Sequence, residues 1–208
     1  MDIQNIAGIT CTIMKQAEPS KKLAVILPGL GYTVLGPLLH YPAQLAFSHG
    51  YDILKIQYQY NPTLSFDEVV SSLYEDVPQV LATFLQTNPY TDYCLIGKSL
   101  GTYAMASVLQ QSDFQTAATI WLTPLLQEDP VYLSMTARSA PGISFIGSAD
   151  TCYVAGRFQT LNESPIQMNL IPDADHTLEL SNSRANDNLA IIMDILNKID
   201  HFLTTHKK

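Results

Sequence analysis

The chain has 208 residues, of which 47% are hydrophobic and only 14% are charged. This composition excludes an intrinsically disordered chain, and the length is sufficient to bury a hydrophobic core without disulfide or metal support, so we expect one domain over residues 1–208. The formal net charge of −8 would repel a phosphate backbone and argues against nucleic acid as a partner.

The cysteines and the N-terminus favour a reducing compartment. The three cysteines have neither the even count of a disulfide framework nor the spacing of a metal site, and we expect them to be reduced core residues. The chain lacks the basic start and apolar block of a secretory signal, and no apolar run approaches the ~20 residues that cross a bilayer. We therefore expect a cytoplasmic protein with no membrane contact, no metal and no cofactor.

Short apolar runs alternate with longer segments of helical periodicity. The runs predict an antiparallel edge strand over residues 5–14 and buried strands over 23–27, 53–58, 93–97, 118–122, 143–147 and 166–171. The segments between them predict helices over 37–49, 66–87, 100–111, 129–139 and 186–204. This alternation is typical of an α/β fold in which a mostly parallel central sheet carries helices on both faces.

A Gly-x-Ser-x-Gly motif, Gly97-Lys98-Ser99-Leu100-Gly101, stands between a predicted strand and a predicted helix. A sharp strand-to-helix turn places the serine in a strained conformation, and only glycine fits at the two flanking positions. Helix N–H groups next to Ser99 would favour developing negative charge. The alternative is a tight structural connection with a serine near the helix cap. A phosphate loop is disfavoured, because it requires a glycine five residues before Gly97.

A serine hydroxyl needs a base that takes its proton and an acid that orients the base. His176 follows the last predicted strand, and Asp150 follows the strand before it. The carboxyl ends of parallel strands meet at one edge of the sheet, so both side chains are expected to converge on Ser99. Taken singly, each is also compatible with an ordinary loop residue. Asp173 and Asp175 are alternative acids, but they share the short loop of His176 and would reach its far ring nitrogen with difficulty.

An oxyanion hole requires backbone N–H groups that point at the charge of a tetrahedral intermediate. Leu100, which follows the candidate nucleophile, is expected to supply one. The loop Pro28-Gly29-Leu30-Gly31-Tyr32, after the first predicted parallel strand, is expected to supply the other from Leu30. A plain strand-to-helix loop or a phosphate cradle is the alternative, although the later glycine of a dinucleotide fingerprint is absent.

The segments PGLGYT, GKSLG, FIGSAD and DADH resemble the α/β-hydrolase superfamily, in particular its small, cap-poor bacterial members, over about residues 23–180. The resemblance implies an eight-stranded type of sheet. It assigns a catalytic triad and two oxyanion donors, namely Ser99, Asp150, His176, Leu30 and Leu100. Pro28 and Lys98 depart from the residues that many members carry at these positions. Residues 122–143 leave room for about one helix instead of a cap, so we expect an open, shallow site.

The expected reaction is hydrolysis of a small-molecule carboxylic ester or thioester through an acyl-enzyme on Ser99. The residues expected to line the substrate pocket are Gly29, Gly31, Tyr32, Lys98, Tyr103, Leu125, Tyr132 and Tyr153. One alternative is a non-catalytic binding protein that keeps the fold. Another is an acyltransferase that uses the same acyl-enzyme.

Overall fold

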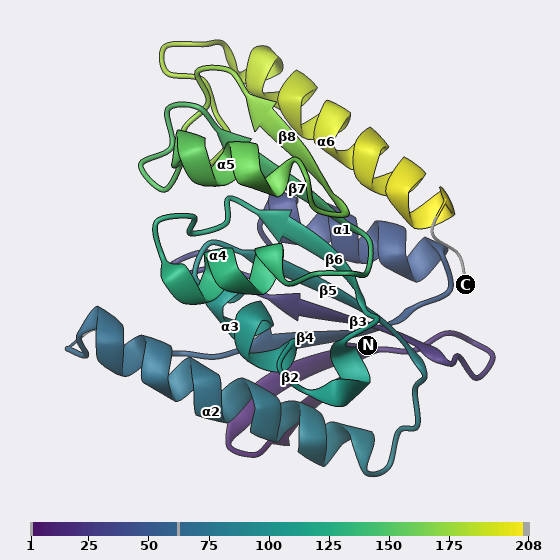
Figure 1. Ribbon diagram of the computed structural model, residues 1–208. Coiled ribbons are helices and arrows are strands. Elements are labelled where there is room, and N and C mark those ends of the chain that lie inside the picture. Colours follow the sequence, from purple (N-terminus) through teal and green to yellow (C-terminus); the bar gives the residue numbers. More distant parts are fainter. Residues whose placement is uncertain (1, 62, 206–208) are drawn as a thin grey trace.

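The computed structural model describes residues 2–61 and 63–205, and its centre is an eight-stranded sheet (Figure 1). The strands are β1 (Asp2–Ile6), β2 (Ile9–Met14), β3 (Lys22–Leu27), β4 (Asp52–Gln57), β5 (Asp92–Lys98), β6 (Ala118–Leu122), β7 (Gly142–Gly147) and β8 (Ile166–Ile171). Their order in the sheet is β1-β2-β4-β3-β5-β6-β7-β8. Strands β3 to β8 pair in parallel, whereas β1 and β2 pair antiparallel at one edge. The predicted mostly parallel sheet is confirmed.

Helices cover both faces of this sheet, as predicted. They are α1 (Pro37–Ser48), α2 (Phe66–Leu85), α3 (Gly101–Val108), α4 (Asp129–Thr136), α5 (Ala155–Leu161) and α6 (Ala185–Thr205), with a 3₁₀ turn, η1 (Ser112–Phe114). Helices α1 and α6 pack together on one face, and α2, α3, α4 and α5 follow one another across the other (Figure 1). Each face encloses its own cluster of buried apolar side chains.

Helix α2 shows how the sequence fixes an element and its orientation. Ser65 caps the helix: its hydroxyl accepts from the backbone N–H of Glu68, and the Glu68 carboxylate accepts from the backbone N–H of Ser65. A capping box of this kind stabilises a helix by about 1 kcal/mol. The buried side chains recur at helical spacing and form one stripe against the sheet: Val69, Leu73, Val77, Val80, Leu81 and Phe84. The cap and the stripe together define where the helix begins and which face it buries.

Two local predictions need correction. Residues 5–14 form a hairpin of β1 and β2 instead of one strand, because Ala7 and Gly8 turn the chain with φ angles of +50° and +87°. Helix α5 was not expected. It has only seven residues, of which Phe158 and Leu161 are buried, and this is too short for a recognisable helical period.

The remaining chain-wide expectations concern cysteines and membranes. Cys11, Cys94 and Cys152 are all buried and free, as expected for reduced core residues. Among the helices of residues 2–61 and 63–205, none has the combination of length and apolarity that a bilayer span requires.

Candidate active site

Ser99 occupies a sharp turn between β5 and α3, with a φ of +52° that non-glycine residues rarely adopt. The glycines on either side permit this turn. A Cβ at Gly97 would lie 2.3 Å from the sulfur of Met105, and a Cβ at Gly101 would lie 2.0 Å from the backbone oxygen of Leu27. Both approaches are closer than any real Cβ contact. The motif therefore forms the strained strand-to-helix turn that the sequence predicts.

Three side chains form a hydrogen-bonded chain at the carboxyl edge of the sheet. Nε2 of His176 lies 2.8 Å from Oγ of Ser99, and Nδ1 of His176 lies 2.9 and 2.8 Å from the two carboxylate oxygens of Asp150. Because a carboxylate only accepts hydrogen bonds, the ring proton belongs on Nδ1, which leaves Nε2 free to accept from the serine hydroxyl. The arrangement can deprotonate a serine.

The loop that carries His176 lies directly on the end of β7. A Cβ at Gly147 would be 1.9 Å from the backbone oxygen of Ala174, so only glycine permits this contact. The Asp150 side chain that follows β7 is completely buried, whereas the His176 side chain is 35% exposed. The carboxylate is therefore shielded from water, whereas the imidazole remains accessible from solvent.

Asp150 is held by a neighbour that sequence reasoning missed. The backbone N–H of Cys152 donates to Oδ1 of Asp150 at 2.8 Å, and the sulfur of Cys152 accepts from the side-chain amide of Gln127 at 3.4 Å. The alternative acid Asp175 accepts instead from N–H and O–H groups of its own loop, including both of Thr177. The orientation of the Asp150 carboxylate thus depends on a backbone N–H that lies just beyond the FIGSAD segment.

Asp150, Cys152 and His176 place one carboxylate oxygen, one sulfur and one ring nitrogen within 4.8 Å of one another, a distance compatible with metal ligation. The hydrogen bonds between Asp150 and His176 already use the ring nitrogen nearest the carboxylate. The donor set therefore fits a paired acid and base better than a closed metal site.

The environment of His176 favours its protonated form. Hydrogen bonding to Asp150, with a smaller contribution from Cys152, raises the pKa of His176 to about 9, while burial and the positive charge of Lys98 act in the opposite direction. The imidazolium that would form during proton transfer is thus stabilised, and the neutral base becomes abundant only at alkaline pH.

Two backbone N–H groups beside Ser99 are available to an oxyanion. Among the described residues, no hydrogen bond has the N–H of Leu30 or of Leu100 as its donor. The loop of Leu30 passes close to the serine, since a Cβ at Gly29 would lie 3.1 Å from Cβ of Ser99 and 3.6 Å from its Oγ. The positions are compatible with the oxyanion hole expected from the sequence.

Solved structures share this architecture. A serine hydrolase homologue from Coxiella burnetii superposes with a TM-score of 0.70 at 17% identity, over 94% of this chain and 91% of the other. An esterase from Pyrococcus furiosus gives 0.72 at 12% identity, over 98% and 91%. A serine hydrolase without a lid from Xanthomonas campestris gives 0.68 at 16% identity, over 96% and 92%. The chain has the α/β-hydrolase fold. No protein-family model and no curated protein sequence matches it.

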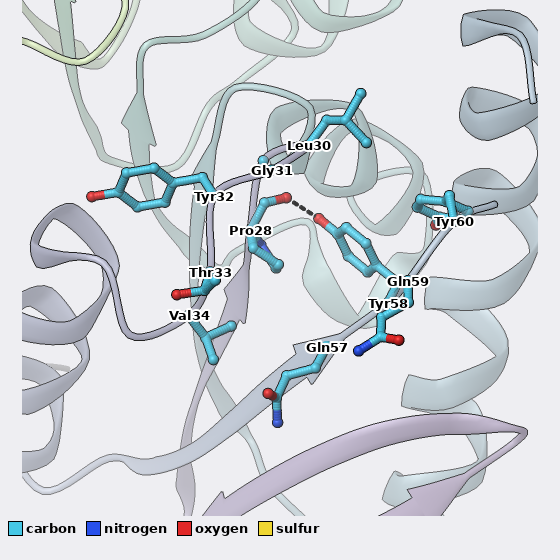
Figure 2. Close-up of a pocket in the computed structure, with 11 residues that line it drawn as sticks. Pro28, Leu30, Gly31, Tyr32, Thr33, Val34, Gln57, Tyr58, Gln59 and Tyr60 are labelled. Atoms are coloured by element: carbon cyan, nitrogen blue, oxygen red, sulfur yellow. Dashed lines mark hydrogen bonds between the residues drawn. The ribbon is translucent and has the colours of Figure 1, made fainter. Parts of the chain in front are cut away.

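This α/β-hydrolase fold has a cavity of about 410 Å³ next to the loop of Leu30 (Figure 2). Its lining comes from the segments after β3 and β4: Pro28, Gly29, Leu30, Gly31, Tyr32, Thr33, Val34, Gln57, Tyr58, Gln59 and Tyr60. None of these side chains is charged. In Figure 2 the hydroxyl of Tyr58 points at the backbone oxygen of Pro28, to which it donates a hydrogen bond. This hydrogen bond holds the loop of Leu30 against the segment after β4. Tyr58 was not expected from the sequence, where nothing distinguishes it from the neighbouring tyrosines.

Only part of the expected pocket lines this cavity. Gly29, Gly31 and Tyr32 do. The other expected residues do not line it. Lys98 is 2% exposed, Tyr103 is buried with its hydroxyl donating to Glu128, Leu125 is buried, Tyr132 lies under the guanidinium of Arg157, and Tyr153 packs against Phe158. Sequence position indicates proximity to a motif, but it does not indicate which face of a strand or helix a side chain occupies.

Proposed function

We propose that the protein is a serine hydrolase that cleaves a carboxylic ester or thioester through an acyl-enzyme on Ser99. The observation that carries the proposal is the continuous hydrogen-bonded chain from the Ser99 hydroxyl through His176 to the buried carboxylate of Asp150. The strained turn of Ser99 supports it, because strain of this kind is concentrated at functional sites. Structural neighbours that include an esterase and a lidless serine hydrolase are consistent with it.

In the proposed acylation step, Oγ of Ser99 attacks the carbonyl carbon while Nε2 of His176 takes the hydroxyl proton. The carbonyl oxygen acquires negative charge and receives hydrogen bonds from the N–H groups of Leu30 and Leu100. Asp150 stabilises the imidazolium. The Nε2 proton then passes to the leaving alkoxide or thiolate, the bond to the leaving group breaks, and the acyl group remains on Ser99.

Deacylation repeats these steps with water as the nucleophile. His176 takes a proton from water, the hydroxide adds to the acyl carbon, and the tetrahedral intermediate again places its oxygen between the two N–H groups. Collapse of the intermediate breaks the bond to Oγ, which recovers its proton from His176. The products are a carboxylic acid and the free serine.

The cavity beside the site supports a substrate with an uncharged group of moderate size. Its lining contains no charged side chain, and three tyrosines provide apolar ring surface. Gln57, Gln59 and Thr33 offer hydrogen bonds without charge. We propose that this cavity receives the acyl or the alcohol portion of a neutral ester.

The proposal is tested with p-nitrophenyl esters and acyl thioesters of increasing chain length, using the wild type and Ser99→Ala. We expect turnover by the wild type, strongest with short or medium uncharged acyl groups, and loss of turnover in the variant. Addition of alcohol acceptors measures the ratio of transfer to hydrolysis and separates an acyltransferase. Folded wild-type protein that turns over no member of either panel would favour a non-catalytic role.

A further inference from the structure

Lys98, the residue between Gly97 and the candidate nucleophile, has no part in the mechanism above, yet it is buried at the centre of the site. Its side chain is 2% exposed. Its ammonium donates to the hydroxyl of Thr123 at 3.2 Å and to the backbone oxygen of His176 at 3.1 Å. It also lies 4.7 Å from the centre of the Tyr32 ring, within the range of a cation–π contact.

These contacts connect the segments that carry the proposed chemistry. Lys98 ends β5 and directly precedes the nucleophile, Thr123 follows β6, His176 follows β8, and Tyr32 belongs to the loop after β3. One side chain therefore ties the base-bearing loop to the nucleophile turn and to the loop of the proposed oxyanion hole. The hydrogen bond to His176 is made to its backbone, so it leaves both ring nitrogens to Ser99 and Asp150.

A positive charge at position 98 contributes little to the stability of the fold. Among the described residues, no carboxylate lies within 4.0 Å of the Lys98 ammonium. A buried cation without an ion pair is unfavourable, and burial lowers the pKa of Lys98 below its ordinary value, although Asp150, Asp175 and Cys152 act in the opposite direction. An uncharged side chain of similar length would fill the same space more easily. A purely structural role therefore does not explain a lysine.

We propose that Lys98 is a positioning residue, which holds the His176 loop against the nucleophile turn and whose positive charge opposes protonation of the imidazole. Its catalytic consequence rests on the proposed function. The hydrogen bonds fix the backbone from which the imidazole reaches Ser99, and misplacement of a reacting group by about 1 Å can reduce a rate by about 100-fold.

The charges around Lys98 determine the direction of its electrostatic effect. Asp150, after β7, and Asp175, in the loop after β8, both favour the ammonium. The imidazole of His176 is the group whose protonation would create a like charge, and Lys98 lowers the pKa of His176. Tyr32 adds no charge there, because burial raises the pKa of its phenol from an already alkaline ordinary value. Removal of the ammonium should therefore make His176 harder to deprotonate.

The test compares Lys98→Met with Lys55→Met. Methionine keeps an unbranched stem and removes the N–H donors and the charge. Lys55 is a matched control, because it is 4% exposed on β4 and burial lowers its pKa as well. With p-nitrophenyl butyrate, we expect Lys98→Met to reduce kcat by about 10- to 100-fold with KM within about threefold, and to move the acidic limb of the kcat/KM profile to higher pH. Lys55→Met should do neither.

A second measurement does not require activity. The pKa of His176 is followed by NMR of ¹⁵N-histidine-labelled protein, with its resonance identified by its absence in His176→Gln. A higher pKa in Lys98→Met than in wild type and Lys55→Met supports the proposal, even if the wild type hydrolyses no ester and the proposed function fails. An unchanged pKa would overturn it, as would an unchanged kcat in an active enzyme. If Lys98→Met does not fold, Lys98→Gln serves for the same two measurements.

Discussion

Nε2 of His176 lies 2.8 Å from Oγ of Ser99, although 77 positions separate the two residues in the chain. The contact arises because β5 and β8 both end at the same edge of the sheet, with β6 and β7 between them. The loop after β8 contains Ala174, and its backbone packs directly against Gly147 at the end of β7. The parallel order of the strands thus assembles the site.

Asp150→Asn is expected to reduce kcat by about 10³- to 10⁴-fold without unfolding the protein. An amide at this buried position favours the wrong ring tautomer of His176, so that Nε2 can no longer accept the serine proton. Asp173→Asn is the matched control, since Asp173 is exposed in the same loop as His176 and has a φ of +58° that asparagine tolerates. Steady-state kinetics decide, and equal activities of the two variants would refute the role of Asp150.

The acidic limb of the kcat/KM profile should extend to alkaline pH. His176 must be neutral to take a proton, and its pKa is raised to about 9 by the hydrogen bond that it donates to Asp150. The neutral fraction therefore grows as pH rises from about 6.5 toward 9, and kcat/KM is expected to grow with it. Initial rates with a thioester that is stable in this range provide the measurement. A profile that is flat from pH 6 to 9 contradicts this account of the base.

Gly101→Ala is expected to destabilise the protein by about 3 kcal/mol or more, because its Cβ would lie 2.0 Å from the backbone oxygen of Leu27, which cannot move without disturbing β3. Gly156→Ala is the matched control. Gly156 lies in α5 with open space around the new Cβ, so this change should stabilise by about 0.5–1 kcal/mol. Urea unfolding of both variants tests the pair, and similar stabilities would show that the turn tolerates a side chain at Gly101.

The proposed substrate cavity predicts a change in charge preference for Gln57→Glu. A carboxylate in this uncharged lining should disfavour anionic esters and favour cationic ones, with a change of about tenfold in the ratio of their kcat/KM values. Gln44→Glu adds the same charge on the exposed surface of α1 and should leave that ratio within about twofold. If both variants behave alike, the cavity does not receive the substrate.

The sequence predicts most of the fold because local and long-range signals agree. The strands after the first hairpin are short apolar runs, and each predicted one lies within one residue of its observed bounds. Helix α5 was not predicted, because seven residues make too few turns to show a helical period. The hairpin turn at Ala7 and Gly8 was not predicted either, because two residues carry too little sequence signal. Local sequence signals are weakest where tertiary contacts determine the conformation of the backbone.

The candidate site could be predicted in part for a similar reason. Ser99, His176 and Asp150 follow strands, so their convergence can be expected from topology alone. The contacts of Lys98 and Tyr58 could not, because they depend on which carbonyl a side chain meets after the loops have packed. The sequence therefore indicates the edge of the sheet at which the three candidate residues meet, whereas the contacts that support them are found only in the three-dimensional structure.

The most direct test of the central claim is covalent labelling with a fluorophosphonate, followed by peptide mass spectrometry. The probe reacts with a serine only where a base activates its hydroxyl. We expect a single adduct on Ser99 of the wild type, none in Ser99→Ala, and at least about 100-fold slower labelling in His176→Gln. Folded wild-type protein that takes up no label, or takes it up at another residue, would contradict the assignment of Ser99 as the nucleophile.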